Sequence, residues 1–310
     1  MQPDTKYISD NKNSPHSRGN RLLEVAERGD VNFDFVVSLK KDEEPYVRSS
    51  VAKALSNFKR RDTLGHLLEL MCDPELHVRG DAVLAAGELG DSRATFAMVN
   101  FFGHVHYELQ KRVFIALKVL GDPRALCFLE DFIERQNDVG DLARESYSAC
   151  AKNKDFLYEF AGRKEMWEDA KHKEGRILVS TDNILDRYSD IVGRIDRPQT
   201  YVVDRKGQLW IGGENLQEHV YVARGERVLS AGEIIFKKVE GIWKVDYANN
   251  RSNGYYPAEN SFVHISQALA NAGITEEQRG FSEIFPREGF CSDDFLIFQQ
   301  FYRGADLDYL

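Results

Sequence analysis

The sequence lacks the features that mark membrane, secreted and zinc-binding proteins. It has no run of about 18 apolar residues, so we expect no membrane-spanning helix. The polar N-terminus has no apolar core of a secretory signal. The cysteines are scattered and form no CxxC pair, which argues against a zinc knuckle or a disulfide framework: Cys72, Cys127, Cys150 and Cys291. These absences favour a cytoplasmic location.

Cationic charge is also scarce. The chain has 41 Lys and Arg against 50 Asp and Glu, which gives a net charge of −9. Because affinity for nucleic acid depends on cationic contacts, a nucleic-acid partner is not expected. Hydrophobic residues make up 42% and charged residues 29%, which predicts packed cores, and 310 residues suffice for two domains.

Motifs that would identify a reaction are missing as well. The sequence contains no glycine-rich phosphate loop, no GxSxG elbow and no HExxH helix, so we predict no catalytic residue, cofactor or bound metal. His104 and His106 offer two imidazoles, but no third ligand lies near them in the sequence, and a capping or solvent-facing role is favoured. Cys291 has no histidine partner in its sequence context and is interpreted as a buried apolar residue.

The first half of the chain repeats itself. Gly90-Asp91-Ser92-Arg93-Ala94 recurs 31 positions later as Gly121-Asp122-Pro123-Arg124-Ala125. Three apolar stripes with i, i+4, i+8, i+11 spacing follow the same offset: Val47, Val51, Leu55 and Phe58; Val78, Ala82, Ala86 and Leu89; Leu109, Val113, Leu117 and Leu120. Each stripe is one face of a helix, and because one repeat cannot bury that face alone, the copies are expected to stack.

Each repeat is predicted to be a pair of helices. Asp73 is a good N-cap with Pro74 at the first helical position, and the first helix then runs to about Leu89. Gly90 supplies the left-handed residue that ends it, and the second helix carries Ala94 to Phe102.

The DP…VR…A…ALG pattern resembles the short HEAT-like repeat of bilin lyase subunits and of many bacterial scaffold proteins. It is carried by Asp73, Pro74, Val78, Arg79, Ala82, Ala86, Leu89 and Gly90. The resemblance implies an α-solenoid that binds a protein partner along its second helices, near residues 64–71, 94–102 and 125–133. It also implies an alternative role as a tetrapyrrole chaperone. Arg48 and Arg79 occupy equivalent positions and are interpreted as bridges to a carboxylate or helix end in the adjacent repeat, with a cationic ladder for an acidic partner as the alternative.

The second half changes to short alternating segments. Residues 200–204 and 209–212 predict a hairpin, and 219–223, 227–230, 232–239 and 242–247 predict further antiparallel strands. A helix follows, with Phe262, Ile265, Leu269 and Ala272 on one face. The aromatic tail from residue 281 is expected to fold over the sheet.

The predicted fold is a HEAT-like α-solenoid followed by a smaller α+β domain with a mainly antiparallel sheet. The predicted division is a disordered segment at 1–19, the solenoid at 20–165, a helical bridge at 166–198 and the α+β module at 199–310.

The stretches VVDRKGQLWIGG, VLSAGEIIF and KVDYANNRSNGYYPAENSF resemble the C-terminal SGHY-type module of plant IQ-motif calmodulin-binding proteins and of bacterial polymorphic toxins and effectors. The resemblance covers residues 200–274, with Tyr255 in place of the histidine and Asn253 in place of the serine. It implies the fold of that module.

The best candidate site is the polar loop that follows the last strand. Its amides, hydroxyl groups and arginine are suited to binding a small polar ligand or a peptide, and the alternative is a turn network in which the side chains satisfy the backbone. The candidate binding residues are Asn249, Asn250, Arg251, Ser252, Asn253, Tyr255 and Tyr256, with His219, Glu233 and His264 as nearby acid–base groups.

Three functions remain open from the sequence. The first is a protein-interaction scaffold that binds its partner through the solenoid, with the C-terminal module as a second contact or regulator. The second is an enzyme or ligand-binding domain in the C-terminal module, with the solenoid selecting its protein target. The third is the tetrapyrrole chaperone.

Overall fold

The computed structural model describes residues 3–102, 106–180, 198–213, 216–240 and 242–275. The described chain divides into two compact units, one over residues 3–152 and one over residues 153–275. Each unit is described by itself. Within the described residues, no helix has the length and apolar character needed to cross a membrane.

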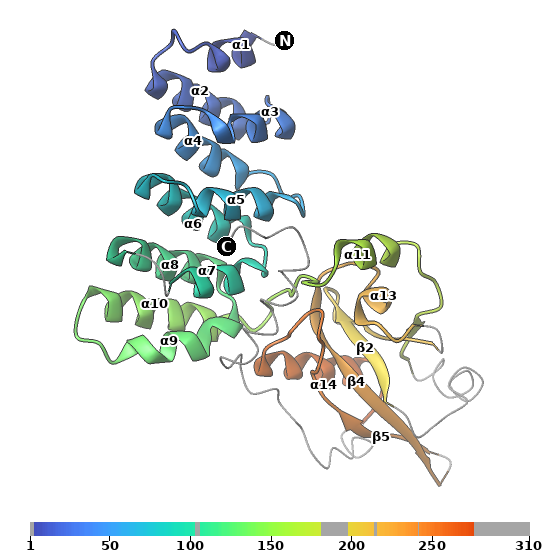
Figure 1. The fold of residues 1–310 in the computed structure, drawn as a ribbon. Helices are drawn as coiled ribbons and strands as arrows, with labels where there is room; N and C mark the ends of the chain where they lie inside the picture. The colour runs from blue at the N-terminus through green and yellow to red at the C-terminus, as the bar shows by residue number, and fades with distance from the viewer. Residues whose placement is uncertain (1–2, 103–105, 181–197, 214–215, 241, 276–310) are drawn as a thin grey trace. The chain divides into compact units, whose positions relative to one another are not determined.

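The first unit is a stack of helices. In chain order these are α1 (Pro3–Ser9), α2 (Pro15–Glu27), α3 (Phe33–Ser38), η1 (Leu39–Lys41), α4 (Pro45–Leu55), α5 (Thr63–Met71), α6 (Leu76–Leu89), α7 (Ala94–Phe102), α8 (Tyr107–Leu120), η2 (Pro123–Ala125), α9 (Leu126–Ile133) and α10 (Asp138–Lys152). The first helices of the repeats, α2, α4, α6, α8 and α10, each pack on the next (Figure 1). The second helices, α3, α5, α7 and α9, pack against this layer. The predicted α-solenoid is confirmed.

The repeat spacing accounts for the core of this unit. Of the three predicted stripes, all but Phe58 are buried, with Val47, Val78 and Val113 fully inaccessible. Fully burying an aliphatic side chain of this size contributes about 1.5–3 kcal/mol. Gly90 and Gly121 end α6 and α8 with φ of 71° and 64°, as predicted. Only glycine adopts this left-handed conformation without steric cost, so the two glycines fix where each helix stops.

Two details of the first unit differ from the sequence prediction. Helix α1 and the start of α2 lie in the segment predicted to be disordered, because Arg18 is buried there and donates to the carbonyl of Ile8 at 2.6 Å and to the carboxylate of Asp42. Helix α6 begins at Leu76 rather than at Pro74. The Asp73 carboxylate accepts from the backbone N–H of Glu75 at 2.9 Å and pairs with Arg48 instead of capping a longer helix.

The second unit is an antiparallel sheet with helices. Its elements are α11 (Lys164–Ala170), β1 (Ile177–Leu178), β2 (Gln199–Asp204), β3 (Leu209–Ile211), α13 (His219–Ala223), β4 (Val228–Val239), β5 (Ile242–Ala248), η3 (Glu259–Ser261) and α14 (Phe262–Asn271). The described strands form a five-stranded sheet in the order β1-β3-β2-β4-β5, with antiparallel pairing throughout. The predicted α+β fold with an antiparallel sheet is confirmed.

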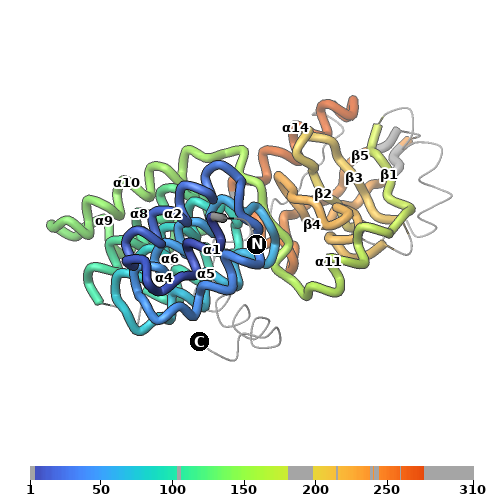
Figure 2. The backbone as a smooth tube through the Cα atoms, turned by 90° about the horizontal axis from the view of Figure 1, so that it is seen from above, coloured from blue at the N-terminus to red at the C-terminus, as the bar shows by residue number. Residues whose placement is uncertain are grey.

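The two faces of this sheet carry different helices. Tyr201 and Val203 of β2 share a buried cluster with Ile265 and Leu269 of α14, so α14 covers one face. Val202 alternates to the other face, where α13 contacts β2, β3 and β4. Figure 2 shows α14 and α11 on opposite sides of the strands.

Several predicted elements of the second unit were wrong. Residues 219–223 form helix α13 instead of a strand, and the two strands predicted at 227–230 and 232–239 are one long strand, β4, which begins at Val228. The segment predicted to be a helical bridge, residues 166–198, contains most of α11 but also contributes β1 to the sheet. The aromatic tail from residue 281 and Cys291 lie outside the described residues.

Candidate functional site

The predicted loop begins where β5 ends, and its first residue points inward. Asn249 is fully buried. Its Oδ1 accepts from the backbone N–H of Glu233 at 3.0 Å and of Arg251 at 2.9 Å. Its Nδ2 donates to the hydroxyl of Tyr247 at 2.6 Å and to the carboxylate of Glu233 at 3.1 Å. Because an amide side chain has two donors and two acceptor lone pairs, these four bonds use the full capacity of Asn249.

Other side chains of the loop also form hydrogen bonds within the protein. Asn250 is fully buried and donates to the carbonyl of Ala258 at 3.0 Å. The hydroxyl of Ser252 accepts from the N–H of Tyr255 at 3.3 Å, and the hydroxyl of Tyr255 donates to the carbonyl of Glu226 at 2.8 Å. These contacts match the turn-network alternative, and a ligand-binding role for the loop stays a proposal.

The remaining loop residues differ in exposure. Tyr256 is buried and has a positive φ of 48°, a conformation that side-chain-bearing residues adopt rarely. Arg251 and Asn253 are exposed. The loop therefore presents two polar side chains to solvent while its other candidates face the interior.

The three predicted acid–base residues do not form one group. The carboxylate of Glu233 accepts from Asn249. His219 Nε2 lies 3.0 Å from the carbonyl oxygen of Gly232, the residue that precedes Glu233 in the chain. Burial lowers the pKa of His219 to about 4, so its imidazole is neutral at pH 7. His264 Nε2 instead bonds to the carbonyl of Lys154 at 2.7 Å. We find no geometry here that assembles a catalytic acid and base.

The loop after α13 was not among the predicted site residues, and side chains from elsewhere in the unit bond to its backbone. Residues 224–227 follow α13, and Arg224 ends that helix with φ of 56°. Trp167 Nε1 donates to the carbonyl of Gly225 at 2.9 Å, and Arg176 Nη1 donates to the carbonyl of Val222 at 3.2 Å. The sequence signal was the Arg-Gly pair, which predicts a turn but does not reveal these contacts.

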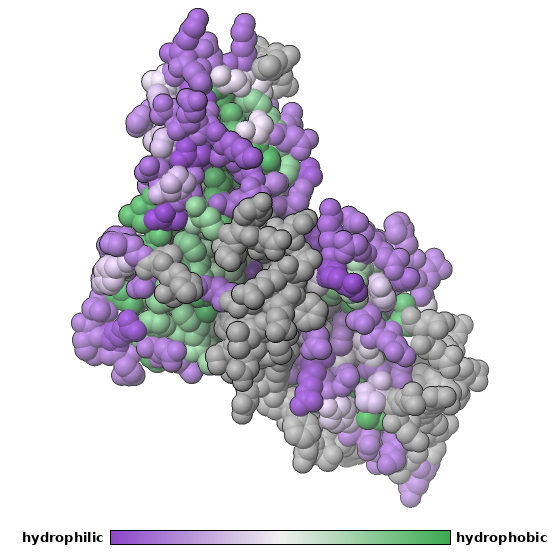
Figure 3. Space-filling model, in the orientation of Figure 1, coloured by the Kyte–Doolittle hydropathy of each residue, from purple (hydrophilic) through white to green (hydrophobic). Residues whose placement is uncertain are grey.

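The surface of the first unit offers a different kind of candidate. Helix α7 contains no charged residue, although Ala97, Val99, Asn100 and Phe101 are each partly exposed. We call these four residues the α7 surface. Phe128 on α9 is equivalent to Ala97 by the repeat spacing and is also partly exposed. In Figure 3, hydrophobic side chains gather over the part of the solenoid where Figure 1 labels α6 to α9.

The first helices also expose apolar side chains. On α8, Ile115 is 37% exposed and Val119 is 56% exposed. Tyr107 begins the same helix and is 41% exposed, and its hydroxyl bonds to Asp138. His106 precedes it and caps α8, accepting from the N–H of Glu108 at 3.3 Å, as the capping interpretation predicted.

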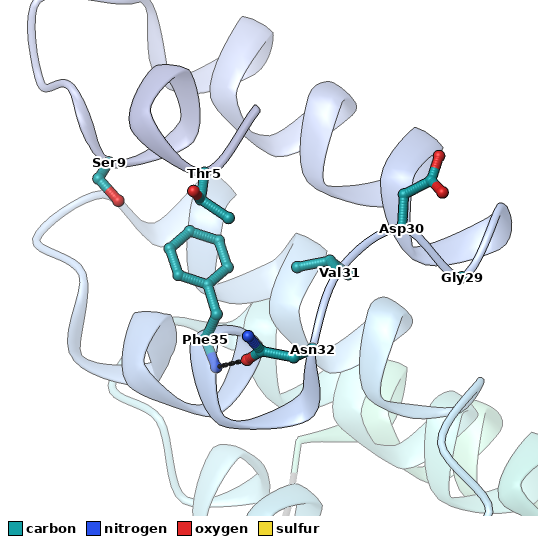
Figure 4. Close-up of a pocket in the computed structure, with 7 residues that line it drawn as sticks. All are labelled: Thr5, Ser9, Gly29, Asp30, Val31, Asn32 and Phe35. Carbon is teal, nitrogen blue, oxygen red and sulfur yellow. Dashed lines mark hydrogen bonds between the residues drawn. The ribbon is translucent and has the colours of Figure 1, made fainter. Parts of the chain in front are cut away.

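An open cavity of about 770 Å³ lies near the N-terminal end of the solenoid. Its lining comes from α1, α3 and the α2–α3 connection: Thr5, Ser9, Gly29, Asp30, Val31, Asn32 and Phe35 (Figure 4). Asn32 is already used there, because its Oδ1 caps α3 by accepting from the N–H of Phe35 at 2.8 Å. Asp30 is the one ionisable residue of this lining, and we assign the cavity no function.

A comparison with protein families agrees with the repeat architecture. A family model described as HEAT repeats matches residues 34–104. Among solved structures, the chain resembles the complex of CpcE and CpcF of phycocyanin lyase from Nostoc sp. PCC7120. The identity is 15%, the match covers 55% of this chain and 70% of that chain, and the TM-score is 0.41. No curated protein matches the chain. The predicted HEAT-like resemblance is supported, whereas the HEAT match ends before the second unit and leaves the SGHY-type resemblance without support.

Proposed function

We propose that this protein is an interaction scaffold whose HEAT-repeat unit binds a protein partner through its second helices, with the α7 surface at the centre. The observation that carries the proposal is the composition of α7. Helix α7 has nine residues and four partly exposed positions but no charged side chain, on a chain in which 29% of residues are charged. Depletion of charge at the centre and apolar side chains beside it are typical of protein–protein interfaces.

The packing beneath the α7 surface supports a rigid binding face. Phe102 of α7 packs edge-on against Phe114 and Phe132, with ring centroids 5.1 and 4.9 Å apart. Phe128 joins the same cluster, at 5.1 Å from Phe102. Aromatic pairs at these distances add about 0.5–1.5 kcal/mol each beyond area burial. A partner that docks on the α7 surface and on Phe128 therefore meets, at Phe128, a side chain already held in this aromatic cluster.

The exposed side chains of α8 form the alternative surface on which a partner could bind. Ile115 and Val119 belong to a first helix, and charged residues of the same helix and of α10 flank them: Lys118 pairs with Glu145 at 2.8 Å. A partner that prefers this face is an alternative outcome of the test. The tetrapyrrole-chaperone and enzyme alternatives have no observation in the described residues that favours them over the scaffold.

The test uses the full chain as bait in lysate of the source cells, with retained proteins quantified by mass spectrometry. Ala97→Glu and Phe101→Glu place a charge on the α7 surface, and Val119→Glu places the same charge on α8 as the matched control. We expect both α7 variants to lose a stoichiometric partner that the control retains. Circular dichroism of each variant establishes that the solenoid is folded. Loss in the control alone would move the binding face to α8.

A further inference from the structure

A cluster of cations on aromatic rings lies between α11 and the end of β3 in the second unit. Three cations lie over three rings: Lys171 over Trp167 at 3.5 Å, Lys173 over Tyr221 at 5.1 Å and Arg176 over Trp210 at 4.0 Å. Such contacts hold a cation in place without neutralising its charge. The neighbouring Arg224 is exposed.

The two arginines of this cluster differ from Arg227 of the same unit. Arg227 is paired with Glu159 at 2.5 Å. Within the described residues, no carboxylate lies within 4.0 Å of Arg176 or Arg224, while Lys173 pairs with Asp169 at 2.9 Å. Arg176 is half-buried and donates to the carbonyl of Val222 at 3.2 Å. Two guanidinium groups thus retain donors that no carboxylate uses.

The pKa of Arg176 reflects the charges around it. Burial lowers this pKa, and the positive charge of Arg224 lowers it further. The negative charges of Asp204 and Glu226 raise it. The carboxylate of Asp204 accepts from Trp210 Nε1 at 2.9 Å and from the N–H of Lys206 at 2.8 Å, so it lies at the edge of the ring that Arg176 covers. Arg176 and Arg224 are therefore close enough for their charges to interact.

The backbone that carries Arg224 is fixed in an uncommon conformation. Arg224 and Gly225 both have positive φ, of 56° and 74°. A non-glycine residue in this region costs about 1–3 kcal/mol and persists only where its surroundings determine it. The surroundings do so here through the bonds from Trp167 to Gly225 and from Tyr255 to Glu226. The result is an arginine presented from a rigid loop.

We propose that Arg176 and Arg224 form a binding site for a phosphate group, with Arg176 oriented by the Trp210 ring and Arg224 by the pinned loop. Guanidinium groups match the oxygens of a phosphate with two parallel N–H···O bonds, and a dianion balances the two positive charges. This site lies in the second unit and does not depend on the proposed partner face of the solenoid.

The experiment titrates the full-length protein with inorganic phosphate and with pyrophosphate by calorimetry at low ionic strength. Arg224→Gln removes an exposed side chain and leaves the core intact, and Arg205→Gln at the exposed β2–β3 turn is the matched control. We expect saturable binding that Arg224→Gln weakens about tenfold or more and that Arg205→Gln leaves within about twofold. Arg176→Lys keeps the charge but loses the planar fork, so it should weaken binding as well.

Three outcomes would overturn the proposal. The first is no saturable binding of either probe. The second is equal weakening by Arg224→Gln and Arg205→Gln, which would indicate attraction to surface charge in general. The third is binding of succinate as tight as that of pyrophosphate, which would assign the site to carboxylates instead.

Discussion

Arg48 and Asp73 form a two-point ion pair between consecutive repeats. Arg48 Nε lies 2.7 Å from Asp73 Oδ2, and Arg48 Nη2 lies 3.0 Å from Asp73 Oδ1. Arg18 and Asp42 form the equivalent pair one repeat earlier. The structural interpretation of Arg48 is therefore confirmed. Arg79 bonds to the carbonyl groups of Asp73 and Pro74 just before its own helix, within its own repeat and not in the adjacent repeat as predicted.

Asp73→Asn tests what this pair contributes to the solenoid. The two side chains are only 11% and 6% exposed, so the variant leaves the Arg48 guanidinium without a buried counter-charge. We expect the free energy of unfolding to fall by about 2 kcal/mol in urea titration. Lys118→Ala, which breaks the exposed pair with Glu145, is the control and should cost less than about 1 kcal/mol. Equal losses of unfolding free energy in the two variants would mean that the buried pair stabilises the fold no more than the exposed pair does.

The same carboxylate predicts a dependence of stability on pH. Burial alone would raise the pKa of Asp73, but the hydrogen bonds from Arg48 and from the backbone of Glu75, together with the charge of Arg48, outweigh it, and the pKa lies below its ordinary value of 3.8. A group with a depressed pKa in the folded state stabilises the fold above its unfolded pKa and loses that contribution as pH falls through the folded pKa. Unfolding midpoints measured from about pH 5 down to about pH 3 should fall, and fall less in Asp73→Asn. An identical decline in both proteins would contradict this cause.

Arg124 gives a sharper stability prediction. Its side chain is 1% exposed, it pairs with Asp122 at 2.6 Å, and it donates to the carbonyl of Ser92 in the preceding repeat at 2.6 Å. A lysine cannot reproduce this fork, so Arg124→Lys should cost about 3 kcal/mol. Arg93→Lys, at the equivalent and more exposed position, should cost about 1 kcal/mol. Thermal unfolding of both variants measures the difference, and a reversed order would refute the ranking.

Tyr255→Phe tests the turn network of the second unit. The variant keeps the ring and removes the hydroxyl that donates to the carbonyl of Glu226, so we expect a loss of about 1 kcal/mol. Tyr221→Phe is the control because its ring, not its hydroxyl, contacts Lys173. If Tyr255→Phe is neutral in urea titration, the hydroxyl does not support the loop. If Tyr255→Phe binds phosphate as tightly as the wild type, the proposed site at Arg224 does not depend on the bond from Tyr255 to Glu226.

The solenoid could be predicted in most of its parts because its signals are local and repeated. Gly90 and Gly121 mark helix ends by a conformation that few other residues adopt, and the stripe from Val78 to Leu89 has the helical period. The start of α6 was placed too early because Asp73 and Pro74 form a good N-terminal signal in isolation. The ion pair with Arg48 comes from another repeat and alters how Asp73 is used.

The second unit could be predicted only in part. Segment 219–223 is short and rich in β-branched residues, so its alternation resembles a strand, and its contacts with β2 come from the tertiary fold. The polar run from Asn249 resembles a binding loop in sequence. No sequence signal distinguishes an amide that faces solvent from one that completes four internal hydrogen bonds. The cluster of Arg176 and Arg224 joins segments that lie far apart in the chain, which periodicity cannot detect.

The most direct test of the scaffold account compares Phe101→Glu with Val119→Glu in quantitative capture by the full-length protein. The account predicts that a stoichiometric partner is retained by the wild type and by Val119→Glu and is lost from Phe101→Glu. Ala97→Glu should repeat that loss while leaving Phe101 in place. Retention of the partner by both α7 variants, with the solenoid folded, would contradict the central claim.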